Sequence, residues 1–216
     1  MILALDTCLT ACSVALLDAG TVLAARSEAM PKGHQERLAS LIAEVMDLAG
    51  VDFRQLTRIG VTIGPGSFTG LRVGLAFAKG LGAALGVPVV GVGTLEALAA
   101  GHPGFVAAVI DARRDQVYLQ VFEDGAALTA PDALPLETAA ARLAEVWSGG
   151  AATLVGSGAP LLAPVLPAAR VLTPEGPDPV AVARLAARGS APVHPPRPLY
   201  LRAPDARLPG GKPLPA

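Results

Sequence analysis

The stretch ILALDTCLTACSVALLDAG, residues 2–20, decides the fold, because its pattern returns later in the chain. A short apolar run ends in an acid at Asp6, and the apolar run that follows closes in a turn at Gly20. Further along, the run FVAAVID ends in Asp111, and the alternating run behind it closes at Gly125. The separation from acid to glycine is fourteen positions in both copies. We therefore predict two β-hairpins whose first strands each end in a carboxylate.

Each hairpin opens a longer unit, so that the order βββαβα(βα) occurs twice in an α/β chain. In the first unit we expect strands over 2–6, 11–17, 21–27, 58–63 and 87–92, and helices over 35–49, 69–86 and 94–100. In the second we expect strands over 105–111, 116–122, 126–129, 153–156 and 170–172, and helices over 138–147 and 179–188. A hinge near 101–104 divides the predicted domains 1–102 and 103–190, and a proline-rich tail, 191–216, is expected to lie along the surface.

Composition limits the classes of function. The chain has 216 residues, 52% of them hydrophobic and only 4% aromatic, which is enough for an aliphatic core. Its net charge of −1 gives no electrostatic reason to expect nucleic-acid binding by the chain alone. The longest uncharged stretch, 80–95, contains Pro88 and falls short of the about 20 residues of a membrane span, and the N-terminus lacks a signal-peptide pattern. We expect a cytoplasmic protein without a membrane association.

The sequence GPGSFTGLRVGLAFAKGLGAAL, residues 64–85, predicts a turn followed by a helix that Ser67 or Thr69 could cap. Small residues recur at every fourth position of this helix, at Gly70, Gly74, Ala78 and Gly82. Larger apolar residues cover most of the remaining surface, and only Arg72 and Lys79 share a polar line. One sheet face cannot bury a helix that is apolar nearly all round. We therefore expect a packing surface that needs a second partner.

Two acids at strand ends are candidates for binding a magnesium–nucleotide through its phosphates. Asp6, with Thr7 beside it, could make such a contact, or it could cap a turn at the end of its strand. Asp111 could act in the same way, but Arg113 and Arg114 could instead neutralise it as an ion pair. The residues by themselves leave both alternatives open.

Other chemical motifs are incomplete. The glycines of 64–70 imitate a dinucleotide-binding turn, but they lie outside a first βαβ unit and no acid follows about 20 residues later. Cys8 and Cys12 lack the further ligands of a zinc site. The three histidines are far apart in the sequence, at His34, His102 and His194. Without a metal ligand set or a nucleophile–base pair, we predict no catalytic residue and no metal site in this chain.

Two halves that each open with an acid-ended hairpin resemble the actin-like (ASKHA) superfamily, in which nucleotide lies between the lobes. A narrower resemblance comes from motifs in a fixed order, which are LALDT at 3–7, GPGSFTGLR at 64–72, GL at 74–75, AKG at 78–80, GTLEAL at 93–98, DAR at 111–113 and YLR at 200–202. Together these motifs resemble the TsaB/YeaZ family over residues 2–202. That family supplies the dimerisation subunit of the bacterial tRNA threonylcarbamoyladenosine machinery.

The resemblance implies an accessory role. Members of the family pair with the catalytic paralogue TsaD and act with the ATPase TsaE, so tRNA would be reached only through the complex, and the chain alone would form a homodimer. The implied contact involves helices 35–49 and 69–85, with Leu38, Leu41, Val45, Gly70, Leu71, Arg72, Gly74, Leu75, Ala78, Lys79 and Gly82 as candidate residues. The only cofactor that the fold leaves open is weakly bound ATP or ADP with magnesium, at Asp6, Thr7 and Asp111.

Two other functions stay open on the sequence. One is an active ATP-dependent transferase or kinase of the same superfamily, which would need a working phosphate site at the two acids. The other is a peptidase, and the absence of an HExxH pattern of zinc ligands argues against it.

Overall fold

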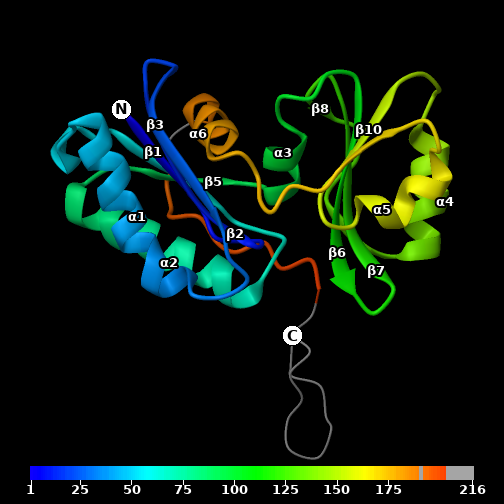
Figure 1. Cartoon of the computed structure of the whole chain (residues 1–216), viewed down its shortest axis with the longest axis horizontal. Coiled ribbons are helices and arrows are strands. Elements are labelled where there is room, and N and C mark those ends of the chain that lie inside the picture. Colours follow the sequence, from blue (N-terminus) through cyan, green and yellow to red (C-terminus); the bar gives the residue numbers. More distant parts are fainter. Residues whose placement is uncertain (190–191, 203–216) are drawn as a thin grey trace, which may run out of the picture.

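Five apolar runs form the first sheet of the computed structural model, which describes residues 1–189 and 192–202 (Figure 1). The strands are β1 (Ile2–Asp6), β2 (Ala11–Asp18), β3 (Thr21–Ala29), β4 (Arg58–Thr62) and β5 (Val89–Val92), in the spatial order β3-β2-β1-β4-β5. β1 is antiparallel to β2 and parallel to β4. One face is covered by α1 (His34–Ala49) and α2 (Phe68–Leu85), and the short helix η1 (Phe53–Gln55) leads into β4.

The second sheet repeats this arrangement. Its strands are β6 (Phe105–Arg113), β7 (Gln116–Glu123), β8 (Ala126–Ala127), β9 (Asp132–Pro135), β10 (Ala152–Val155) and β11 (Arg170–Leu172), in the order β11-β10-β6-β7-β8, with β9 also paired to β7. β6 is antiparallel to β7 and parallel to β10, as β1 is to β2 and β4. Helices α4 (Leu136–Val146), α5 (Ala159–Leu162) and η2 (Ala163–Val165) cover its outer face. The duplicated α/β fold predicted from the two hairpins is confirmed.

The two halves exchange one helix each. α3 (Thr94–Ala99) follows the first sheet in the chain but packs on β6 and β7 of the second. α6 (Pro179–Arg188) follows the second sheet but packs on β1, β2 and β4 of the first. Figure 1 shows both helices between the two sheets. Chain order favours placing helix 179–188 in the second unit, but in the structure this helix packs on the first sheet.

Small side chains explain where α6 lies. Its buried face consists of three alanines, one valine and the proline at its start, and it meets Ala4 and Ala15 of the first sheet. A Cβ atom at Gly60 would lie 2.6 Å from the Cβ of Ala186, so β4 carries a glycine where the helix crosses. Tight contact between small residues of this kind depends on position and gives no periodic signal in the sequence.

Arg58, at the start of β4, holds the C-terminal end of α6. One of its guanidinium nitrogens donates to the carbonyl oxygens of Ala186, Ala187 and Gly189, at 2.6, 3.1 and 2.6 Å. These carbonyls belong to the end of the helix, where backbone acceptors lack partners within the helix and a cation is favourable. The side chain therefore joins the last helix to the first sheet.

We expect Arg58→Met to lower the free energy of unfolding by roughly 2 kcal/mol, because it leaves partly buried carbonyl groups without their charged donor. Thermal and chemical denaturation would measure the change. Arg54→Met is the matched control, since Arg54 is 86% exposed and pairs with Asp52 at the surface, and it should change stability much less than Arg58→Met does. Equal losses in the two variants would contradict the role given to Arg58.

The described part of the C-terminal segment, 192–202, lies against the first lobe and ends at the second. The amide of Leu199 donates to the carbonyl of Ile63 at 2.7 Å, and Arg202 donates to the carbonyl of Ala112 in β6 at 2.9 Å. In Figure 1 this orange-red segment passes below the first sheet toward β6. The rest of the predicted tail, 203–216, lies outside the described residues. Among the helices of the described chain, we find none with the length and hydropathy that a membrane span needs.

Candidate functional site

The start of α2 lies directly on the loop between β1 and β2. The amide of Ser67 donates to the carbonyl of Cys8 at 2.7 Å, and the Ser67 hydroxyl caps the helix by accepting from the amide of Gly70 at 3.3 Å. A Cβ atom at Gly70 would clash with the carbonyl oxygen of Thr7, and one at Gly74 would lie 2.6 Å from the Thr7 hydroxyl. The glycines of this helix therefore serve a close approach of helix to loop.

Asp6 and Thr7 lie below the helix, inside the first lobe. The hydroxyl of Thr7 donates to the carbonyl of Gly70 at 2.7 Å. Asp6 is fully buried, and its Oδ1 accepts from the hydroxyl of Thr62 at 2.6 Å and from the amide of Cys8 at 3.1 Å. Neither residue lines the cleft between the lobes. Thr7 is covered by α2 and Asp6 by the segment around Gly176, and a contact of either residue with nucleotide stays a prediction.

The Asp6 carboxyl is short of partners. Its Oδ2 has no hydrogen-bond partner among the described residues, and a Cβ atom at Gly176 would lie 3.2 Å from it. Burial raises the pKa of Asp6 to about 6, and the hydrogen bonds from Thr62 and Cys8 offset only part of that effect. Burial likewise raises the pKa of Cys8 to about 12, so this thiol stays protonated and donates to the Thr62 hydroxyl at 3.1 Å. These groups form an internal polar cluster rather than a reactive site.

A cleft of about 650 Å³ separates the two lobes. The first lobe contributes Thr10, Lys32, His34 and Ser67 to its walls, and the second contributes Asp111, Arg113 and Ser157. The segment before α6 borders the cleft at Glu175, whose carbonyl accepts from the amide of Thr10 at 2.9 Å and whose carboxylate accepts from the Thr10 hydroxyl.

Asp111 is the only one of the three predicted nucleotide contacts on the wall of this cleft. Its carboxylate lies 3.4 Å from the guanidinium of Arg113 and also accepts from the Arg113 amide at 2.8 Å. The ion pair anticipated as an alternative therefore forms. Within residues 1–189 and 192–202, no group of three or more His, Cys, Asp or Glu side chains is placed to hold a metal ion.

Three comparisons with known proteins agree with this geometry. A family model described as "TsaD: tRNA N6-adenosine threonylcarbamoyltransferase" matches residues 26–138. The protein of Escherichia coli (strain K12) named "tRNA threonylcarbamoyladenosine biosynthesis protein TsaB" is 38% identical over 122 residues, which cover 54% of this chain and 52% of that protein. The solved structure "YeaZ from Pseudomonas aeruginosa" superposes with a TM-score of 0.76 at 32% identity, covering 93% of this chain and 99% of that one.

The chain belongs to the TsaB/YeaZ family. The matched stretch spans about half the length of the E. coli relative. The biosynthetic role that this relative's name states is therefore only a proposal for the present TsaB/YeaZ chain. A ROK hexokinase from Thermus thermophilus, at a TM-score of 0.51 and 16% identity over 86% of this chain and 98% of its own, shares the fold alone. The actin-like architecture predicted from the two hairpins is confirmed.

The helix residues proposed as a partner contact are mostly internal to this TsaB/YeaZ chain. The buried ones are Leu38, Leu41, Val45, Gly70, Leu71, Gly74, Leu75, Ala78 and Gly82. They pack on the first sheet, because a stripe of small residues lets α2 lie close to β1 and β4. Only Arg72, which is exposed, and Lys79, which is half-buried, remain at the surface. A partner of this chain therefore cannot meet the glycine stripe without unfolding the lobe.

The outward side of the two helices is also apolar. Its exposed and half-buried residues are Ala39 and Ala43 on α1 and Val73, Phe77, Gly80, Leu81 and Ala84 on α2, and we call this set the α1–α2 face. This face could have been found from the sequence. On the helical wheels of α1 and α2, its residues lie on the sides that the leucines and the glycine stripe do not occupy.

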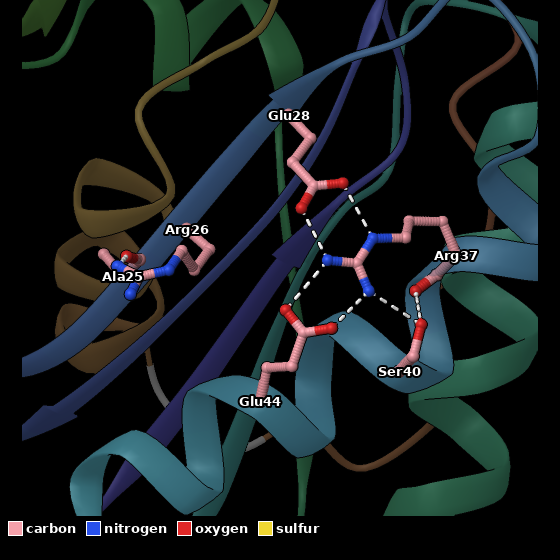
Figure 2. Close-up of polar contacts among 6 residues, drawn as sticks. All are labelled: Ala25, Arg26, Glu28, Arg37, Ser40 and Glu44. Atoms are coloured by element: carbon pink, nitrogen blue, oxygen red, sulfur yellow. Dashed lines mark hydrogen bonds and ion pairs between the residues drawn. The ribbon is translucent and has the colours of Figure 1, made fainter.

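Arg37, which the sequence analysis did not single out, fixes the orientation of α1. Its guanidinium binds the carboxylate of Glu28 on β3 at 2.5 and 2.7 Å and that of Glu44, two turns along α1, at 2.5 and 2.8 Å (Figure 2). The hydrogen bonds from Arg37 lower the pKa of both carboxyl groups. This network occupies the flank of α1 toward β3, so Ala39 and Ala43 face the α2 side.

The burial of Asp6 gives a pH-dependent stability. A pKa raised from 3.8 to about 6 means that the folded chain binds the proton more tightly, so stability is greatest below pH 4 and falls as the pH rises through 6. The native chain should lose roughly 3 kcal/mol of its free energy of unfolding over this pH range. We expect the Asp6→Asn variant not to show this loss and to be more stable than the native chain at pH 8.

Denaturation curves at pH 4.5 and pH 8 measure this difference. Asp47→Asn, a change of an exposed aspartate on α1, is the control and should keep the native pH profile. An Asp6→Asn variant with an unchanged profile would show that the buried carboxyl does not titrate as its surroundings require.

Proposed function

We propose that this chain is a non-catalytic subunit that pairs with a TsaD-type catalytic subunit, and acts with TsaE, in threonylcarbamoylation of the tRNA adenosine beside the anticodon. The α1–α2 face is the observation that carries the proposal. It consists of exposed alanines and a glycine and of half-buried larger apolar residues on two adjacent helices, with the Arg37 network on the far flank of α1 and the glycine stripe beneath α2. Solvent-exposed apolar strips of this kind are typical of subunit contacts.

The cleft supports the same proposal from the chemical side. Asp111 on its wall is paired with Arg113, and Asp6, the corresponding acid of the other hairpin, is buried inside the first lobe. Acyl transfer needs a nucleophile with its base or a metal-bound activator. The described part of the cleft offers neither arrangement, so catalysis falls to the partner. The proposed reaction is taken from the names of two relatives, which specify threonylcarbamoyladenosine biosynthesis. A cytoplasmic location is part of this proposal, because the proposed substrate is tRNA.

Co-purification with the TsaD-type protein of the same organism tests the pairing. We expect the native chain to be retained and the double variant Ala43→Arg, Ala84→Arg to lose at least tenfold in capture, because both alanines are exposed and a long cation there would hold the helices apart. Ala144→Arg, an exposed helical alanine on α4, is the matched control and should be captured like the native chain. The same variants should abolish a homodimer of the isolated chain in light scattering. Full capture of the double variant would reject the α1–α2 face.

An ATP-dependent transferase or kinase is the second candidate, and the size of the cleft and the position of Asp111 favour testing it. We expect the purified chain to release no phosphate from ATP above background, because the only acid of the pair that faces the cleft is already neutralised by Arg113. Isothermal titration and a phosphate-release assay measure binding and turnover. Turnover that is lost in Asp111→Asn but kept in Asp115→Asn, an exposed acid of the same hairpin, would establish the enzyme instead.

A further inference from the structure

Two half-exposed aromatic rings meet at the start of α2. Phe68, the first residue of the helix, is 50% exposed, and Tyr200 of the C-terminal segment is 47% exposed. Their ring centres are 5.7 Å apart and their planes differ by 29°, which is a stacked arrangement. The guanidinium carbon of Arg72 lies 3.7 Å from the centre of the Phe68 ring, and its Nε donates to the Tyr200 hydroxyl at 3.1 Å. We call these three side chains the Phe68 platform.

The platform is separate from the α1–α2 face. With about 100° per residue, Phe68, Arg72 and Lys79 fall within about 40° of one another on the helical wheel of α2. Phe77 and Leu81, in contrast, lie on the flank that packs toward α1. Tyr200 reaches the platform from the other side, because Leu199 before it is hydrogen-bonded to Ile63 at the end of β4. The two surfaces can therefore be tested independently.

The chain around the platform carries cations and no carboxylates. Between Asp52 and Glu96 the sequence contains Arg54, Arg58, Arg72 and Lys79 and not one acid. The same is true from Asp178 to Asp205, the stretch that supplies Tyr200, Arg197 and Arg202. Helix α1, in contrast, presents Glu36, Glu44 and Asp47. The charged residues of α2 are thus both cations, Arg72 and Lys79, and the segment beside it adds Arg197 and Arg202.

Arg113 extends this positive region toward the cleft. It lines the cleft together with Ser67 and Thr69, which flank Phe68 in the sequence, and its side chain is 86% exposed. One of its donors faces Asp111, and its exposure leaves the others open to a ligand. The platform and the cleft rim therefore offer an aromatic stack, guanidinium groups and hydroxyls on neighbouring turns.

We propose that the Phe68 platform binds RNA, by stacking an unpaired base on the Phe68–Tyr200 pair while Arg72 and its neighbouring cations contact phosphates. Aromatic rings combined with arginine are the common means by which proteins hold single-stranded nucleic acid. The hydrogen bond between Arg72 and Tyr200 holds the stack in place before a ligand arrives, which reduces the ordering that binding requires. The two stretches of sequence that supply the platform contain no acid, which suits a polyanion, and the acids on the wall of the adjoining cleft are Glu36, Asp111 and Glu175. That the RNA is tRNA rests on the proposed function.

The test uses the full chain with its co-purified TsaD-type subunit and a transcribed, unmodified tRNA that carries adenosine beside the anticodon. We expect the double variant Phe68→Ala, Tyr200→Ala to weaken tRNA binding about tenfold or more, since each stacked base loses its ring. Tyr200→Phe keeps the stack and should stay within about threefold of native. Arg72→Gln should also reduce the slope of log affinity against log salt by about 0.7, whereas Arg54→Gln, an exposed cation of η1, should leave it unchanged.

Several outcomes separate this inference from the proposed function. Native-like tRNA binding by the double aromatic variant, or no tRNA binding by the native pair, would overturn the platform while pairing of the subunits stood. Loss of the TsaD-type subunit from the double aromatic variant, with its thermal unfolding unchanged, would show a protein contact and also overturn it. Failure of the native chain to pair would instead reject the proposed function, and the same titrations on the chain alone would still decide whether the platform binds RNA.

Discussion

The close contact between α2 and the β1–β2 loop is the constraint on which the rest of the structure depends. Because Gly70 and Gly74 carry no side chain, the helix backbone lies against Thr7, and the Thr7 hydroxyl reaches the Gly70 carbonyl. This contact holds Thr7 beneath the helix, whereas Cys8, Leu9 and Thr10 of the same loop line the cleft. It also sets the rotation of α2 about its axis, and so determines which residues of the helix can face anything outside the lobe.

The exchange of α3 and α6 couples the two lobes around the same loop. The chain leaves the second sheet after β11, passes Glu175 and Gly176 over Thr10 and Asp6, and then begins α6 on the first sheet. The carboxyl of Asp6 is thereby enclosed by both halves of the chain and carries a raised pKa. Asp6, the acid that ends the first strand, therefore lies where the two lobes are connected. Burial favours its neutral form more than it would for an exposed aspartate.

Much of the fold could be predicted from local pattern, because the two acid-ended hairpins and the amphipathic helix repeat in order. The helix expected over 35–49 runs from His34 to Ala49, and the one expected over 69–86 runs from Phe68 to Leu85. The partner contact expected at the glycine stripe of α2 stays a prediction, and the stripe packs on the chain's own first lobe. Period alone shows that Gly70, Gly74, Ala78 and Gly82 share a stripe but not which surface the stripe meets. A stripe of glycine suits the backbone of its own sheet as well as that of another chain. The Phe68 platform gave no signal at all, because Phe68 and Tyr200 are brought together only by the path of the C-terminal segment.

With its glycine side committed to the sheet, α2 has two flanks left, and they differ in chemistry. The flank toward α1 is apolar and continues onto the alanines of that helix, which suits the proposed contact with another subunit. The opposite flank has aromatic rings and cations without carboxylates, which suits a polyanion. The N-terminal end of α2 lies against the carbonyl of Thr7. The directions of both flanks therefore follow from the glycines along a single line of α2, which let the helix lie against its own sheet and loop.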